Sequence, residues 1–111
     1  MHVLVDFTIS PERARVEWTL NCIRQFLRSA VEVTGLIPFG PEIVREADHL
    51  LMGIQMIAES HISLHLDRAK GCGWADVFSC REVSAGKVSK LIDDLFEAEQ
   101  FVEVLKRGQL P

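Results

Sequence analysis

The stretch that begins at Glu59 combines side chains that can react with one another. It reads Glu59-Ser60-His61, a second histidine follows at His65, and Cys80 comes fifteen positions after that. A serine hydroxyl or a cysteine thiol can act as a nucleophile or a proton donor, and an imidazole can move protons because it titrates near neutral pH. Three kinds of chemistry fit such a set: metal binding, serine hydrolysis and attack of the chain on itself.

Metal binding and serine hydrolysis are the weaker interpretations. His61 and His65 lie on one face of a predicted strand, but they supply only two ligands and no motif adds a third, so we expect no metal. Ser60 stands in no G-x-S-x-G elbow of the kind that α/β-hydrolases use. Either histidine taken alone is more simply explained as a half-buried polar residue of the sheet.

Attack of the chain on itself requires only Ser60 and the residue before it. The Ser60 hydroxyl is within reach of the Glu59 carbonyl, and in a strained turn it can attack that carbonyl and move the acyl group from nitrogen to oxygen. β-Elimination of the ester then breaks the chain and leaves dehydroalanine at position 60, which loses ammonia and becomes a pyruvoyl group. His65 is the residue that we expect to move the protons.

Length and composition limit the class of protein. The 111 residues fit one domain, which we expect to span 1–111, and they can bury a core without metals or disulfides. A net charge of −4 argues against a nucleic-acid partner, and no apolar run is long enough for a membrane span. The first residues lack the features of a signal peptide, so we expect a cytoplasmic protein. Cys22, Cys72 and Cys80 form no C-x-x-C pair, which indicates reduced thiols.

The hydrophobic pattern predicts the elements that must position the reactive residues. Ser10 and Pro11 have the residue types of a helix start, and Gly35 has that of a helix stop. We expect, in order, a strand over 2–9, one long helix from Pro11 that ends before Gly35, at most a short strand within 35–44, a strand over 50–58 with Gly53 as a candidate bulge, strands over 61–66 and 74–80 joined by a turn, a helix over 84–99 and a strand over 100–108.

Strands joined by short turns predict an α+β fold built on an antiparallel sheet. Two amphipathic helices would cover one face, and the other face, left partly apolar, predicts a homodimer in which two sheets pack as a sandwich. Alternation puts His61 and His65 on one face and Ile62 on the other. Ser60 would fall on the Ile62 side of a straight strand, so we expect the Glu59–Ser60 bond to lie in a turn before the strand.

The block from Glu59 to Cys80 resembles the prokaryotic, self-processing S-adenosylmethionine decarboxylases. The family pattern has Glu-Ser-His, an apolar residue, Ser or Thr, an apolar residue and His, then a turn and Val-Asp-x-Phe-Thr-Cys. Here ESHISLH is followed by ADVFSC with no gap in the match. The resemblance extends over nearly the whole chain, because the order of elements and the His2-Val3-Leu4 start also fit.

The resemblance implies a role for each reactive residue. Ser60 would become the pyruvoyl cofactor, which binds the substrate as a Schiff base, so no metal or pyridoxal phosphate is expected. Cleavage would separate a β chain, 1–59, that ends at Glu59, from an α chain, 60–111. His65 would transfer protons during this processing, and Cys80 would donate the proton that replaces carbon dioxide. The substrate would be S-adenosylmethionine, decarboxylated for the synthesis of polyamines such as spermidine.

Two departures from the family pattern keep other functions open. Asp67, Arg68 and Ala69 replace a Trp-Pro-Glu that follows the processing histidine, and Met52 replaces a serine that assists processing. We expect His61 and Arg68 to contact the substrate, and an arginine that pairs with a carboxylate would also suit a basic amino acid, arginine or ornithine. A third hypothesis is an unprocessed, non-enzymatic relative or binding subunit.

Overall fold

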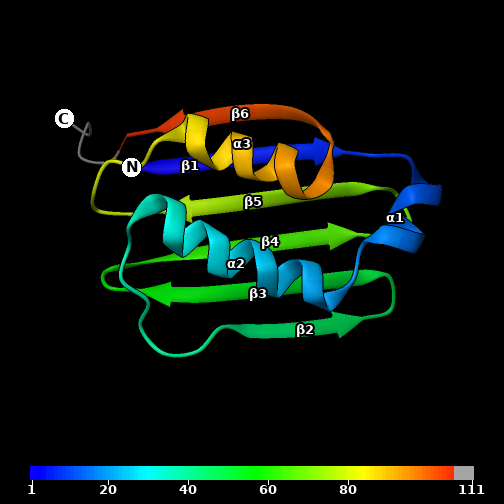
Figure 1. Cartoon of the computed structure of the whole chain (residues 1–111), viewed down its shortest axis with the longest axis horizontal. Coiled ribbons are helices and arrows are strands. Elements are labelled where there is room, and N and C mark those ends of the chain that lie inside the picture. The colour runs from blue at the N-terminus through cyan, green and yellow to red at the C-terminus, as the bar shows by residue number, and fades with distance from the viewer. Residues whose placement is uncertain (107–111) are drawn as a thin grey trace.

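The computed structural model describes residues 1–106, which form a six-stranded antiparallel sheet and three helices (Figure 1). The elements are β1 (His2–Thr8), α1 (Pro11–Glu17), α2 (Leu20–Thr34), β2 (Ile43–Ala47), β3 (Leu50–Ile57), β4 (Ser60–Asp67), β5 (Cys72–Phe78), α3 (Ala85–Phe96) and β6 (Glu99–Leu105). The strands lie in the order β2-β3-β4-β5-β1-β6. The predicted α+β class and antiparallel sheet are therefore confirmed, and positions 107–108 of the predicted last strand lie outside the described residues.

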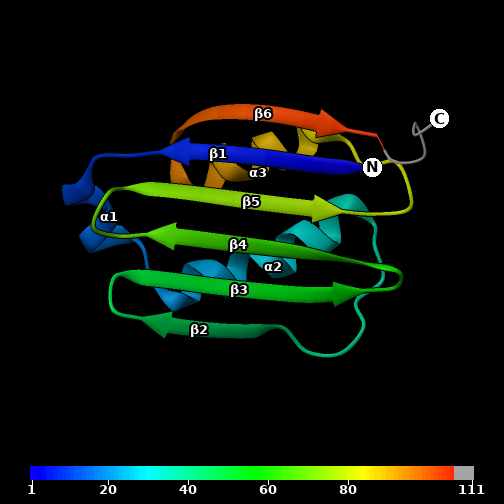
Figure 2. The same cartoon turned by 180° about the vertical axis from the view of Figure 1, so that it is seen from behind.

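Two of the helices cover one face of the sheet, as predicted. Figure 1 shows α2 lying across β3 and β4, with α3 beside it near β1 and β6, and Figure 2 shows the opposite face of the sheet without helices. We call this second face the open face. The alternation of β4 is also confirmed, because Ile62, Leu64 and Leu66 are fully buried toward the helices while His61 and His65 lie on the open face.

The single long helix predicted from Pro11 is wrong, because the chain leaves helical geometry at Trp18. Trp18 and Thr19 are extended, with ψ angles of 118° and 167°, and the Thr19 side chain caps α2 by accepting a hydrogen bond from the backbone N–H of Cys22. This break lets the Trp18 side chain enter the core against Phe7 and Phe96. Burial of an indole outweighs continuation of the helix.

Two strands, β2 and β5, also lie at other positions than predicted. The short strand expected within 35–44 begins only at Ile43, because Pro38 and Pro41 interrupt the preceding segment, which pairs with the sheet only where Pro38 faces Ile57. β5 covers 72–78 in place of 74–80. The turn before it is shorter than expected because the Asp67 carboxylate accepts hydrogen bonds from the backbone N–H groups of residues 69 and 70, at 3.0 and 3.1 Å.

Gly53 forms no bulge, so that prediction is also wrong. It pairs in regular register with Val44 on one side and Leu64 on the other. Glycine is needed here because α2 passes so close that a Cβ at this position would lie 2.2 Å from the Ile23 side chain. The missing side chain therefore sets the distance between α2 and the sheet.

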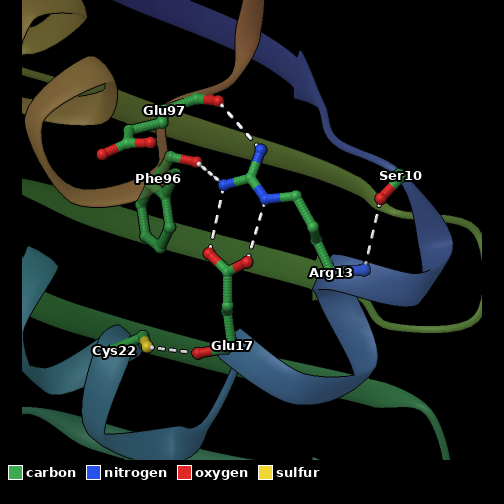
Figure 3. Close-up of polar contacts among 6 residues, drawn as sticks. All are labelled: Ser10, Arg13, Glu17, Cys22, Phe96 and Glu97. Atoms are coloured by element: carbon green, nitrogen blue, oxygen red, sulfur yellow. Dashed lines mark hydrogen bonds and ion pairs between the residues drawn. The ribbon is translucent and has the colours of Figure 1, made fainter.

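Arg13 ties α1 to the end of α3 at the edge of the core (Figure 3). Its guanidinium donates to both carboxylate oxygens of Glu17, at 2.9 and 3.1 Å, and to the carbonyl oxygens of Phe96 and Glu97, at 3.1 and 3.3 Å. The hydrogen bond from Arg13 also holds the pKa of Glu17 below its ordinary value. The last carbonyls of α3 thus gain partners that the helix itself cannot supply.

We predict that Gly53→Ala lowers the free energy of unfolding by about 1–3 kcal/mol, because α2 must move to accommodate the new methyl group. Gly86→Ala is the matched control, since a Cβ there meets nothing closer than the Ser84 hydroxyl at 3.7 Å and an alanine in a helix is expected to be neutral or stabilising. Urea unfolding of the two variants measures the difference. Equal stabilities would contradict the close approach of α2.

Candidate active site

The Glu59–Ser60 bond lies at the junction of a tight turn and β4. Ala58 and Glu59 alone connect the paired residues Ile57 and Ser60. Glu59 has a φ of +67°, a left-handed conformation that costs a residue other than glycine about 1–2 kcal/mol. The backbone strain is therefore stored in the residue whose carbonyl group joins Ser60.

The Ser60 hydroxyl lies beside this carbonyl group. It donates a hydrogen bond to the Glu59 carbonyl oxygen at 2.5 Å and accepts one from the backbone N–H of Cys80 at 3.2 Å. These two hydrogen bonds hold the hydroxyl from both sides, next to the peptide bond that it would attack. No pattern of side chains in the sequence could have revealed the Cys80 contribution, since the donor is a backbone group.

Cys80 brings a second reactive group to the same carbonyl. Its thiol lies 3.6 Å from the Glu59 carbonyl oxygen and is positioned to donate to it. The pairing of His61 with Phe78 in antiparallel strands explains this proximity. Residue 59, two positions before His61, and residue 80, two positions after Phe78, lie at the same end of the sheet. A hollow of about 130 Å³ adjoins the bond and is lined by Leu36, Ile37, Ala58, Glu59, Ser79, Cys80 and Arg81. The exposed thiol faces a space that a small ligand group can enter.

His65 is not brought to Ser60 within one chain. It lies on the open face, between Met52 and Trp74 on the neighbouring strands, with its ring parallel to the Trp74 indole at 5.4 Å. It lies five positions after Ser60, which corresponds to about 16 Å of extended strand. Its Nδ1 is buried and has no hydrogen-bond partner among the described residues. The processing role expected of His65 thus stays a prediction, and direct contact within one chain is excluded.

His61 lies near the reactive end of the open face. Its ring stacks on Phe78 at 5.5 Å, and Phe78 also meets the edge of the His2 ring. Asp76 joins this group, because it accepts from Ser63 at 3.5 Å and pairs with His2 at 3.1 Å. Sequence analysis missed the His2–Asp76 pair, although the alternation of the two strands could have placed both side chains on the open face.

Arg68 does not reach Ser60 either. It follows the far end of β4, where its guanidinium donates to the Arg15 carbonyl oxygen at 2.9 Å and its backbone N–H donates to the His49 carbonyl oxygen at 2.9 Å. The first contact fastens α1 to the β4–β5 turn, and the second joins that turn to the turn between β2 and β3. The argument that Arg68 pairs with a substrate carboxylate beside Ser60 therefore loses its geometric basis within one chain.

Within residues 1–106, no group of three or more His, Cys, Asp or Glu side chains could hold a metal ion. All three cysteines are free thiols. None of the helices described is both long and apolar enough to span a membrane.

The chain is similar in sequence to known proteins of one family. The family model for S-adenosylmethionine decarboxylase matches residues 1–108. The chain is 32% identical over 88 residues to an S-adenosylmethionine decarboxylase proenzyme of Archaeoglobus fulgidus, which covers 78% of this chain and 79% of that protein. It is 30% identical over 86 residues to the proenzyme of the same name from Aquifex aeolicus, covering 76% of this chain and 61% of that protein.

A solved structure shares the fold. The crystal structure of the adenosylmethionine decarboxylase from Aquifex aeolicus superposes with a TM-score of 0.72 at 20% identity, over 99% of this chain and 95% of the other. This likeness concerns the fold, and the sequence matches concern the family. The chain belongs to the S-adenosylmethionine decarboxylase family.

Proposed function

We propose that the chain cleaves itself between Glu59 and Ser60 and then decarboxylates S-adenosylmethionine with a pyruvoyl group made from Ser60. The observation that carries this proposal is the Ser60 hydroxyl, 2.5 Å from the carbonyl oxygen of the strained residue before it, with the Cys80 thiol 3.6 Å from the same oxygen. The two curated relatives are both named proenzymes, which supports a precursor that is processed.

The residues around the bond fit the first step of the cleavage, the attack of Ser60 on the Glu59 carbonyl group. The Cys80 N–H holds the Ser60 oxygen in place, and the Cys80 thiol, by donating to the Glu59 oxygen, polarises the carbonyl that Ser60 attacks. The acyl group then moves from the nitrogen of Ser60 to its oxygen. Elimination then breaks the ester, which leaves a new C-terminal carboxylate on Glu59 and dehydroalanine at position 60. Addition of water with loss of ammonia converts the dehydroalanine into the pyruvoyl group.

The same residues fit the decarboxylation. The pyruvoyl ketone supplies the electron sink for the electrons left when carbon dioxide departs. Residue 60 begins β4 and is held there by its pairing with Ile57, which fixes the group against the end of the sheet. Cys80 is the acid beside it, and we propose that its thiol returns a proton to the substrate carbon.

A second copy of the chain would supply His65. The open face carries exposed apolar side chains on four strands, Ile43, Met56, Trp74, Phe101 and Leu105. Two such faces packed together would bury this apolar surface and form the sandwich. The Glu59–Ser60 bond lies at the exposed tip of a hairpin, so a partner that covers the open face can approach it. We propose that His65 acts on Ser60 of the other copy in a homodimer.

The cleavage is tested first with Ser60→Ala, which removes the hydroxyl that attacks. We expect this variant to fold and to remain one chain, whereas the parent separates into two chains under denaturing mass analysis, the second beginning with a pyruvoyl group. Ser89→Ala, which removes a hydroxyl on α3 bonded to Gln100, should be cleaved like the parent. A parent protein that stays intact at 12.5 kDa would instead favour the unprocessed, non-enzymatic homologue.

The action of His65 on Ser60 of the other copy is tested by co-expression of two differently tagged variants. His65→Ala alone and Ser60→Ala alone should each remain uncleaved. In hybrid dimers, the Ser60→Ala chain supplies its His65 to the His65→Ala chain, so about half of the His65→Ala chains should be cut if the copies mix at random. Hybrid dimers that are isolated by both tags and contain no cut chain would refute the proposal.

Release of carbon dioxide identifies the substrate. We expect turnover of S-adenosylmethionine, and a much lower kcat/KM for arginine and ornithine, because the Arg68 guanidinium is already bonded to the Arg15 carbonyl oxygen of α1 in place of a substrate carboxylate. Arg68→Gln should accordingly lower stability and leave the preference among the three substrates unchanged. A higher kcat/KM for either amino acid would assign the chain to a basic amino-acid decarboxylase.

A further inference from the structure

We propose that Ser79 is a positioning residue whose buried side chain sets the turn that holds Cys80 against the Glu59–Ser60 bond. The consequence for catalysis rests on the proposed function, whereas the turn itself is a property of the fold. Ser79 is 2% exposed and directly follows β5.

Three hydrogen bonds fix Ser79 and the chain after it. Its backbone N–H donates to the Met1 carbonyl oxygen at 2.9 Å, and its carbonyl oxygen accepts from the Met1 nitrogen at 2.6 Å, which extends the β1–β5 pairing by one residue. Its side-chain oxygen accepts from the backbone N–H of Arg81 at 3.0 Å. This last bond spans Cys80 and turns the chain back immediately after it, as serine side chains do in local turns.

Cys80 has few contacts of its own that could replace this turn. It lies beyond the end of β5 and is exposed, so no strand pairing holds it. Its thiol contact at 3.6 Å is weak, and its firm contact is the N–H bond to the Ser60 hydroxyl at 3.2 Å. The positions of both Cys80 groups that face the reactive bond therefore depend on the residue before them.

Loss of the Ser79 hydroxyl should disturb both steps that use Cys80. The Arg81 N–H loses its partner, the turn loosens, and the thiol and N–H of Cys80 no longer converge on residues 59 and 60. Cleavage should slow by on the order of ten- to hundred-fold, since displacements of about 1 Å have effects of that size. During turnover, more protons should reach the carbon of residue 60 in place of the substrate carbon. That error, after water adds, leaves alanine at the start of the α chain and releases an aldehyde.

The experiment compares Ser79→Ala with Ser79→Thr and with Ser84→Ala. Ser84 is the matched control, because its side chain also accepts from a backbone N–H, that of Lys87 at 3.2 Å, but in the cap of α3. We expect Ser79→Ala to slow cleavage and to raise the fraction of α chains that begin with alanine, and Ser79→Thr, which keeps the oxygen, to recover most of the cleavage rate. Ser84→Ala should lose thermal stability without either effect.

A second measurement reports on the position of Cys80 and does not depend on cleavage or decarboxylation. In the uncleaved Ser60→Ala protein, Ser79→Ala should change the rate at which iodoacetamide modifies Cys80 several-fold and leave the rates at Cys22 and Cys72 unchanged. Unaltered Cys80 labelling together with parental cleavage in Ser79→Ala would overturn the role of Ser79, and so would equal changes at all three thiols. A parent that neither cleaves nor decarboxylates would refute the proposed function, while the labelling would still decide about Ser79.

Discussion

The register of β4 with its two neighbours is the constraint on which the rest of the site depends. Pairing of Ile57 with Ser60 leaves two residues for the turn, and one of them, Glu59, must adopt a left-handed backbone. Pairing of His61 with Phe78 brings the end of β5 to that turn. A slip of β4 by one residue would move its apolar residues out of the core and separate Cys80 from Ser60. Core packing and reactive geometry are thus enforced by the same alignment.

Most of the sheet could be predicted from the sequence because burial on one face of a strand imposes a period of two. Residues 61–66 show this alternation, and their faces were predicted correctly. The break at Trp18 could not be predicted, since apolar residues keep helical spacing across it and the gain comes from aromatic contacts with distant elements. The bulge predicted at Gly53 failed for a similar reason, because the need for glycine arises from α2 and is absent from the strand itself.

The features of the site also fall into those that could be predicted from the sequence and those that could not. The resemblance to the family placed the Cys80 thiol beside the reactive serine, and the structure brings that thiol to 3.6 Å from the Glu59 carbonyl oxygen. The Cys80 N–H, the turn at Ser79 and the fastening of Arg68 to α1 involve backbone atoms, which carry no signature in a sequence. His65 illustrates a further limit, because strand spacing gives its face but not whether its target lies on the same chain.

The order of the strands determines how the two pieces of a cleaved chain would be held together. Residues 1–59 contribute β1, β2 and β3, and residues 60–106 contribute β4, β5 and β6, yet β1 lies between β5 and β6. The two pieces would therefore meet along three strand boundaries, with the Arg13 bonds to α3 as an additional link. Such pieces cannot separate without unfolding, so unfolding would become a dissociation whose midpoint depends on protein concentration. Folding would therefore have to precede cleavage, so that the strands of both pieces assemble while they still belong to one chain.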